Sequence, residues 1–73
     1  MATLSPHMKL VGDKLRKARE DKILSHRELA LRAELSPTTV LKLENAEVST
    51  PHPRTIRKLA AALEIDAREL LEG

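Results

Sequence analysis

Two helix-start signals lie close together near the middle of this 73-residue chain. Ser25 and Glu28 form a capping-box pattern, in which each side chain bonds a backbone amide of the other's turn. Ser36 suits an N-cap, and Pro37 suits the first helical position because its missing amide would have no partner there. Apolar residues follow each signal at helical spacing. The two helices that these signals predict run from Ser25 to Ala33 and from Ser36 to Asn45.

The rest of the chain also shows helical patterns. Val11, Leu15 and Ala18 recur at helical spacing, and Asp66 with Glu69 forms a second box-like pair. No segment alternates with a period of two over a useful length, so no strands are predicted. The expected fold class is all-α, a compact bundle of five short helices. The remaining predicted helices span about Met8–Lys22, Arg54–Leu63 and a short segment beginning at Asp66.

Length and composition limit the possible architectures and partners. A chain this short forms one domain with a marginal core, and without Cys it has no disulfide to support that core. It has no aromatic residue, which argues against single-strand binders that stack bases on aromatic rings. The net charge of +2 permits nucleic-acid binding. We expect residues 1–7 to be a flexible arm or an added segment, and residues 8–73 to form the domain.

Several classes of function lack their signatures. The sequence has no nucleophile elbow, and its two glycines cannot form a Gly-rich phosphate loop. His7, His26 and His52 lack metal-ligand spacing. We therefore predict no enzyme activity, no catalytic residue, no metal site and no cofactor. The apolar run Leu59–Leu63 is too short to cross a membrane, and no signal peptide is visible, so a cytoplasmic location is predicted.

Two short capped helices joined by a tight turn are typical of the helix-turn-helix motif. In that motif the first helix crosses the DNA backbone, and the second places its N-terminal residues against base edges in the major groove. The amides at both helix N-termini can then face phosphates. Lys42 could donate to guanine, and Thr38 could contact a base edge or a thymine methyl group. Leu41 could equally contact a thymine methyl group, bind a partner protein or be an ordinary exposed leucine.

The segment from Gly12 to Leu71 resembles the Xre/Cro-like helix-turn-helix family of phage and bacterial repressors. The resemblance implies a lambda repressor-like domain of five short helices that binds duplex DNA as a dimer. The residues that carry it are Leu15, Arg16, Arg19, Glu28-Leu29-Ala30, Leu35-Ser36, Val40, Glu44-Asn45, Leu59-Ala60, Ala62-Leu63 and Leu70-Leu71.

The same resemblance implies roles for individual positions. Arg19 and Glu44 correspond to an ion pair between the first helix and the recognition helix. His26 stands where Gln is usual, Pro37 replaces a residue that often reads a base, and Ala46 stands where Gly often ends the helix. The residues implied to contact base edges are Thr38, Thr39, Leu41 and Lys42. Those implied to contact phosphates are Ser25, His26, Ser36, Asn45 and Arg54.

The predicted function is therefore sequence-specific binding of an inverted-repeat operator by a homodimeric, nucleoid-associated transcriptional regulator, expected to be a repressor. An antitoxin-type regulator that also binds a toxin would have the same pattern. A protein-bridging helix-turn-helix module without specific DNA readout is a further alternative. The dimer contact is expected near the last helix or in a region beyond this chain. Its candidate residues are Leu63, Ile65, Leu70 and Leu71.

Overall fold

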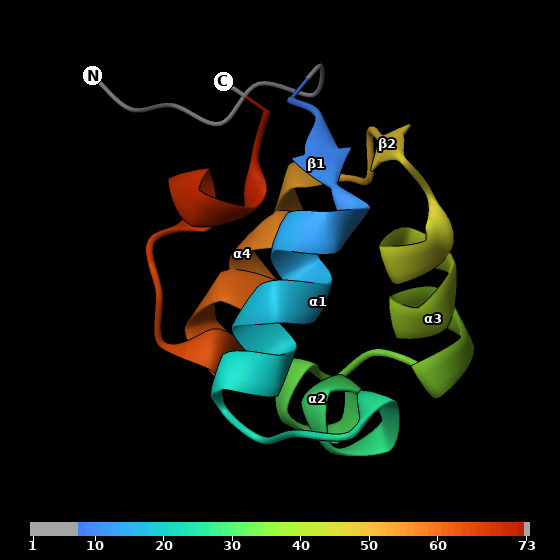
Figure 1. The fold of residues 1–73 in the computed structure, drawn as a ribbon, viewed down its shortest axis with the longest axis vertical. Coiled ribbons are helices and arrows are strands. Elements are labelled where there is room, and N and C mark those ends of the chain that lie inside the picture. Colours follow the sequence, from blue (N-terminus) through green and yellow to red (C-terminus); the bar gives the residue numbers. More distant parts are fainter. Residues whose placement is uncertain (1–7, 73) are drawn as a thin grey trace.

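The computed structural model describes residues 8–72, which form a small bundle of helices (Figure 1). The predicted arm at residues 1–7 and the predicted last residue of the domain, Gly73, lie outside the described residues. Within them, four α-helices are followed by one 3-10 helix, so the all-α prediction of five short helices is confirmed. The elements in chain order are β1 Leu10–Val11, α1 Gly12–Asp21, α2 His26–Ala33, α3 Pro37–Asn45, β2 Val48–Ser49, α4 Pro53–Leu63 and η1 Ala67–Leu70.

Two short strands show that the prediction of no strands was wrong. β1 and β2 pair antiparallel, with Leu10 opposite Ser49 and Val11 opposite Val48. Leu10 also forms an isolated bridge to Leu71. These contacts thus join the start of the described chain to the segment after α3 and to the C-terminal end of the described chain. A strand of two residues is too short to contain an alternating pattern, so hydrophobic periodicity does not detect it.

The first helix is shorter than predicted because the strand occupies its expected first turn. The sequence predicts a helix from Met8, whereas α1 begins at Gly12. Val11 precedes it in extended conformation (φ −97°, ψ 120°) and supplies no side-chain cap. The helix predicted from Arg54 begins one residue earlier, at Pro53, because the missing amide of proline would have no partner in the first turn.

The predicted helix starts are observed as hydrogen-bonded caps. The Glu28 amide donates to Oγ of Ser25 at 3.0 Å, and the Ser25 amide donates to Oε1 of Glu28 at 2.9 Å. Oγ of Ser36 accepts a hydrogen bond from the Thr39 amide at 3.1 Å. A second capping box joins Asp66 to the third residue of η1. These bonds satisfy amides that would otherwise lack partners in the first turn of each element.

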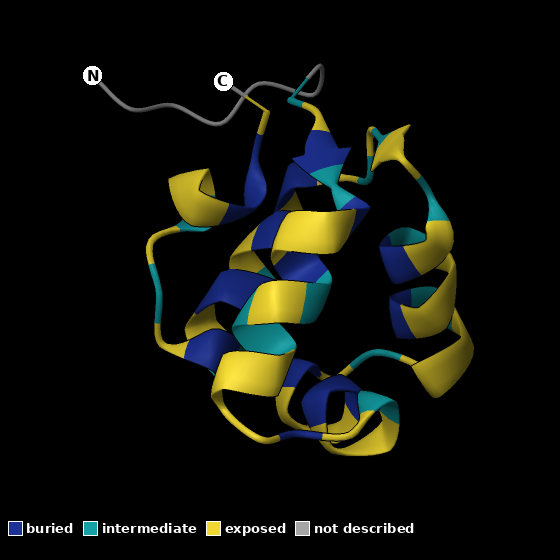
Figure 2. Cartoon of the chain, viewed as in Figure 1, coloured by how far each residue is buried: buried dark blue, intermediate teal, exposed yellow. Residues whose placement is uncertain are grey.

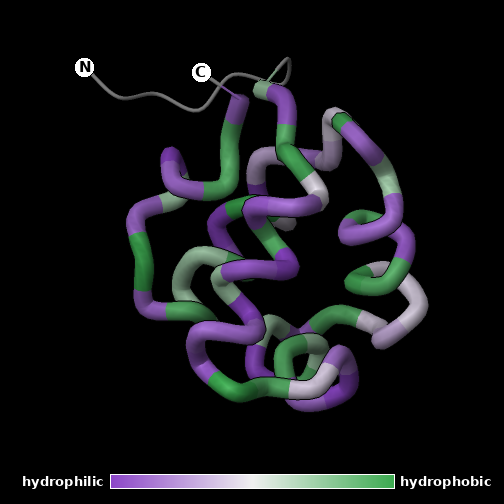
Figure 3. Tube along the Cα trace, in the orientation of Figure 1, coloured by the Kyte–Doolittle hydropathy of each residue, from purple (hydrophilic) through white to green (hydrophobic). Residues whose placement is uncertain are grey.

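Aliphatic side chains from every helix meet in one core. Every helix carries both buried and exposed positions (Figure 2), and hydrophobic positions recur along the chain between hydrophilic ones (Figure 3). Leu15 of α1, Leu29 of α2, Val40 of α3 and Ile56 of α4 are all fully buried. Such close packing is sensitive to the loss or gain of a single methylene group. The core therefore fixes the positions of α2 and α3 relative to α1 and α4.

Three of the four residues predicted to form a dimer contact belong to this core. Leu63 and Leu70 are fully buried, and Leu71 is 5% exposed. The prediction for these three is corrected, because their side chains pack within the single chain. Helical spacing identifies an apolar face but does not show whether the same chain or another covers it. Ile65 is only partly buried and keeps accessible surface.

Candidate nucleic-acid interface

The turn between α2 and α3 is short and well defined (Figure 1). After α2 ends, Glu34 adopts the left-handed conformation (φ 57°, ψ 43°), which reverses the chain. The Leu35 amide donates to the Ala30 carbonyl at 2.8 Å and closes the end of the helix. Ser36 is extended and caps α3. Three residues thus connect the helices, and their hydrogen bonds fix the orientation of α3.

One face of α3 is open to solvent while the other packs on the core. Val40 and Glu44 are buried, one turn apart on the inner side. Thr38 and Lys42 are exposed, also one turn apart, and Leu41 beside them is 44% exposed. The outer face of α3 therefore presents a hydroxyl, an ammonium group and an apolar side chain close together.

Thr39, the fourth residue predicted to contact a base edge, differs from these three. It is partly buried, and its Oγ1 lies 2.8 Å from Oγ of Ser36. The Ser36 hydroxyl also accepts the Thr39 amide. Both hydroxyls therefore take part in the cap of α3, and the structure brings Thr39 to the helix start rather than to its open face.

The predicted ion-pair residues Arg19 and Glu44 meet between α1 and α3. Nε of Arg19 lies 2.6 Å from Oε2 of Glu44, and NH2 lies 3.1 Å from Oε1. NH1 of Arg19 donates to the Leu24 carbonyl at 2.7 Å, so the guanidinium also holds the segment before α2. A planar guanidinium matches a carboxylate in this paired geometry. Arg19 thus links α1 both to α3 and to the segment before α2.

The environment of Glu44 favours its ionised form. Burial of the carboxylate opposes ionisation, but the hydrogen bonds and charge of Arg19, assisted by His26, outweigh it and lower the pKa of Glu44. The hydrogen bond to Glu44 in turn raises the pKa of Arg19, despite the partial burial of the guanidinium. The pair is therefore charged at neutral pH, with its carboxylate excluded from water.

Two further basic residues surround the same carboxylate. Nε2 of His26, at the start of α2, lies 3.0 Å from Oε1 of Glu44. Nε of Arg16 lies 3.6 Å from Oε1, and its NH2 lies 3.5 Å from Oδ1 of Asn45. Sequence reasoning treated Arg16 only as a family match and missed this contact. Its position three residues before Arg19, on the same face of α1, is the signal that could have found it.

The other residues predicted to contact phosphates lie at helix ends. Ser25 is exposed and its hydroxyl accepts the Glu28 amide, while Asn45 is exposed at the last position of α3. Arg54 is exposed in the first turn of α4, where its amide donates to Nδ1 of His52 at 3.0 Å. Glu44 and its partners Arg16, Arg19 and His26 form one group of charged side chains, the Glu44 cluster. Asn45 adjoins this cluster through Arg16, whereas Arg54 belongs to another element.

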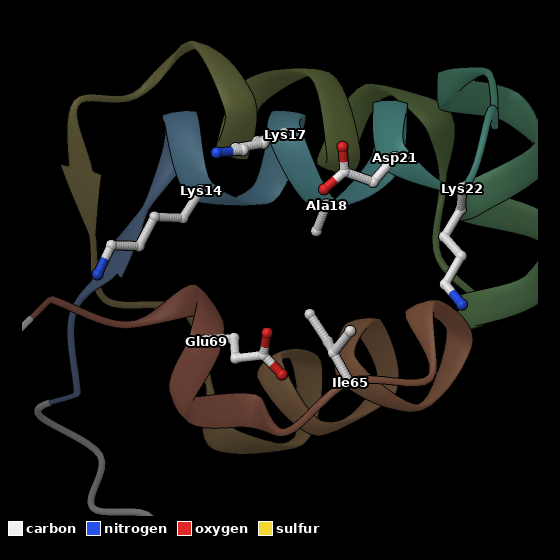
Figure 4. A pocket seen from close by; sticks show the side chains of 7 residues that line it. All are labelled: Lys14, Lys17, Ala18, Asp21, Lys22, Ile65 and Glu69. Atoms are coloured by element: carbon white, nitrogen blue, oxygen red, sulfur yellow. The ribbon is translucent and has the colours of Figure 1, made fainter.

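A shallow hollow of about 350 Å³ lies elsewhere, between α1 and the segment that joins α4 to η1 (Figure 4). Ala18 and Ile65 supply its apolar surface, and Lys14 and Lys22 reach toward it from α1 and its C-terminal cap. Nζ of Lys14 donates to the Leu71 carbonyl at 2.7 Å. None of the residues predicted to contact DNA lines this hollow.

Residues 8–72 contain no group of three His, Cys, Asp or Glu side chains that could hold a metal ion. None of the helices in this range is long and apolar enough to cross a membrane.

Known proteins resemble the chain in both sequence and fold. RghRB of Bacillus subtilis, an uncharacterized HTH-type transcriptional regulator, is 38% identical over 60 residues, which cover 82% of this chain and 43% of RghRB. The HTH-type transcriptional repressor RghR of the same organism is 36% identical over 64 residues, covering 88% and 47%. The restriction-modification controller protein C.AhdI from Aeromonas hydrophila superposes with a TM-score of 0.75 at 37% identity, covering 81% of this chain and 84% of C.AhdI.

The chain spans less than half the length of the two Bacillus relatives. A helix-turn-helix family model matches residues 15–70, which include all four α-helices except the first turn of α1. The family and these regulator relatives agree with the prediction that the chain is not an enzyme. The short turn, the capped α3 and its ion pair with α1 lie within the matched segment. The chain therefore belongs to the Xre/Cro-like helix-turn-helix family.

Proposed function

We propose that this chain binds duplex DNA sequence-specifically, with α3 in the major groove, as part of a dimeric transcriptional repressor. The observation that carries the proposal is the open face of α3, held in place by the Arg19–Glu44 pair. A helix that reads bases must keep a fixed position against a rigid scaffold. The repressor assignment is supported by the relative RghR, a transcriptional repressor.

The side chains on this face suit base edges in different ways. Lys42 can donate to O6 or N7 of guanine, and the Thr38 hydroxyl can donate or accept. Leu41 offers an apolar contact to a thymine methyl group. Each good direct contact gives about 1–3 kcal/mol of discrimination against a wrong base. So few polar readers favour modest direct readout, supplemented by the shape of the DNA.

Phosphate contacts would set the register of α3 in the groove. The amides and hydroxyls at the starts of α2 and α3, with Ser25, His26 and Ser36, would face one strand. Asn45 lies at the other end of α3, and Arg54 could reach the backbone from the start of α4. Thr39 would act at the start of α3, close to the same phosphates.

A dimer would place two copies of α3 in successive major grooves, about one helical turn apart, on an inverted repeat. Ile65 is the predicted dimer-contact residue with accessible surface, and a segment outside this chain could supply the rest. Bound at an operator, such a dimer would obstruct polymerase. A cytoplasmic protein associated with the nucleoid would fit this role.

The proposal is tested by selecting binders from random duplex DNA at physiological salt and sequencing the retained pool. Enrichment of an inverted repeat is expected, with a half-site spacing that reports the geometry of the dimer. Retention without any enriched sequence would contradict specific readout and favour a protein-bridging role.

Three variants test whether side chains of α3 determine the DNA sequence that is selected. Lys42→Ala should change the preferred bases, whereas Arg54→Ala should weaken binding to all sequences alike. Lys17→Ala is the matched control, because it removes the same charge from an exposed residue beside the hollow in Figure 4. Equal, uniform weakening by all three variants would show that α3 does not read bases.

A further inference from the structure

We propose that DNA binding by this chain is coupled to protonation of His26, whose imidazole joins the buried Glu44 carboxylate to a DNA phosphate. The inference rests on the proposed function, which places a phosphate at the start of α2. It adds a proton as a regulator of that same contact, so that the protein binds DNA more tightly as the pH falls.

The contact with Glu44 decides which imidazole nitrogen carries hydrogen. Nε2 of His26 lies 3.0 Å from Oε1 of Glu44, and an ionised carboxylate can only accept hydrogen bonds. Nε2 therefore donates whether the ring is neutral or charged. A neutral imidazole has one N–H group, so Nδ1 then presents a lone pair. Among residues 8–72, Nδ1 has no hydrogen-bond partner, and the His26 side chain is 39% exposed.

A phosphate beside Nδ1 would distinguish the two forms of the ring. Phosphate oxygens accept hydrogen bonds, so neutral His26 would set a lone pair against them. The imidazolium instead donates from both nitrogens, to Glu44 on one side and to phosphate on the other. Charge-assisted hydrogen bonds of this kind are roughly twice as strong as neutral ones. DNA therefore favours the protonated ring, and proton uptake favours DNA.

The charged groups next to His26 already have partners within the chain, so His26 is the one proposed to respond to the phosphate. Arg19 of α1 is committed to both carboxylate oxygens of Glu44 and to the Leu24 carbonyl. Arg16, also of α1, lies 3.6 Å from Oε1 and bonds Asn45 of α3. Without His26, the Glu44 cluster has one carboxylate and two guanidinium groups. A proton on His26 adds positive charge on the side of the cluster where α2 begins.

The other histidines must be removed to isolate this effect. Nδ1 of His52 accepts the Arg54 amide at 3.0 Å, so its protonation would break a cap at the start of α4. His52 could therefore give DNA binding a pH dependence of its own. His52→Asn keeps a capping acceptor that does not titrate. Together with His7→Gln, it leaves His26 as the sole histidine of the original three.

The experiment compares this single-histidine protein with the same protein carrying His26→Gln. Gln keeps a donor for Glu44 but does not titrate. The dissociation constant for a selected duplex is measured from about pH 6 to about pH 8, the range in which histidine commonly titrates, at constant ionic strength. The single-histidine protein should bind about tenfold more tightly per protomer at the acidic end. The His26→Gln protein should bind with the same affinity throughout.

Two results would overturn the proposal. One is the same pH dependence in both proteins. The other is an Nδ1–H tautomer for His26, detected by NMR of the imidazole nitrogens in the free protein. The tautomer is measured without DNA, so it separates failure of the His26–Glu44 geometry from failure of the proposed function. If neither protein binds any duplex at any pH, the proposed function fails and the coupling fails with it.

Discussion

Glu44 is the residue of α3 that contacts basic side chains of both α1 and α2. Its carboxylate is buried and contacts Arg16 and Arg19 of α1 and His26 of α2. A buried carboxylate is costly to desolvate, and its partners must compensate for that cost. The resulting network adds little net stability compared with an apolar core, but it fixes α3 against two other helices.

Removing this carboxylate should destabilise the fold. Glu44→Ala leaves the partly buried guanidinium of Arg19 without its partner, and loss of one member of a buried pair costs about 3 kcal/mol or more. The measurement is urea unfolding followed by circular dichroism. The double variant Arg19→Met/Glu44→Leu is the control, because removing both charges should recover much of the loss. A Glu44→Ala protein as stable as the parent would show that the pair acts as a surface contact.

Glu44 should also make stability depend on acidity. Its pKa is lower in the folded chain than the ordinary value of 4.5. The corresponding stability is therefore fully present above about pH 4.5 and is lost as the pH falls through the lower folded value. In Glu44→Gln the unfolding free energy should fall less steeply on acidification. Asp66, whose pKa the hydrogen bonds from Arg68 lower to about 2, should leave a residual slope in both proteins. Identical slopes would contradict the prediction.

Gly12 occupies a position where the structure has no room for a side chain. A Cβ atom there would lie 2.2 Å from the Ala46 carbonyl oxygen and 2.5 Å from that of Glu44. Both atoms belong to the backbone at the end of α3, so neither can rotate away. Gly12 therefore permits the close approach of α1 to α3.

Because α1 and α3 lie so close, Gly12→Ala should change the stability in the direction opposite to that expected from helix propensity. Gly→Ala in an open helix stabilises by roughly 0.5–1 kcal/mol. Gly12→Ala should instead destabilise by about 1–3 kcal/mol, because α1 and α3 must separate. Chemical unfolding would measure the difference between the Gly12→Ala protein and the parent. A stabilised Gly12→Ala protein would mean that the helices adjust freely.

At the scale of elements, local hydrogen-bonding chemistry made the helix starts predictable. Ser25, Ser36 and Asp66 each satisfy amides of the turn that follows, and a capping side chain is visible in the sequence. The strands were not predictable, since β1 and β2 exist only because α3 brings their segments together. The start of α1 was missed for a local reason, because Val11 has no capping side chain.

Helix ends offer a further prediction. Glu34 ends α2 in the left-handed conformation (φ 57°), which glycine adopts without the steric cost that a Cβ atom brings. Glu34→Gly should therefore stabilise the fold by up to about 1 kcal/mol, as measured by thermal and urea unfolding. Glu34→Ala removes the same charge and keeps the Cβ atom, so it should not share the gain. An equal gain in both variants would assign the effect to the charge.

For the whole molecule, the sequence revealed the fold class and the exposed face of α3, but not which apolar residues remain accessible. Leu63, Leu70 and Leu71 follow the helical period, and they pack inside the chain. Ile65, which lies between Leu63 and Leu70 in the sequence, stays partly accessible. Burial of this kind depends on how η1 folds back over α1 and α4, a long-range arrangement that no local pattern encodes.

The residues proposed to contact phosphates lie on several elements, and together they predict how strongly DNA binding by a dimer depends on salt. If each protomer of a dimer makes about four phosphate contacts, the logarithm of the binding constant should fall with the logarithm of salt concentration with a slope of roughly −7. Fluorescence anisotropy on a selected duplex at a series of salt concentrations would measure it. Arg54→Ala should reduce the slope by about one unit per protomer, and Lys17→Ala, on the surface beside the hollow, should leave it unchanged. A shallow slope that neither variant alters would contradict groove binding by α3, because such binding cannot occur without releasing counterions from the backbone.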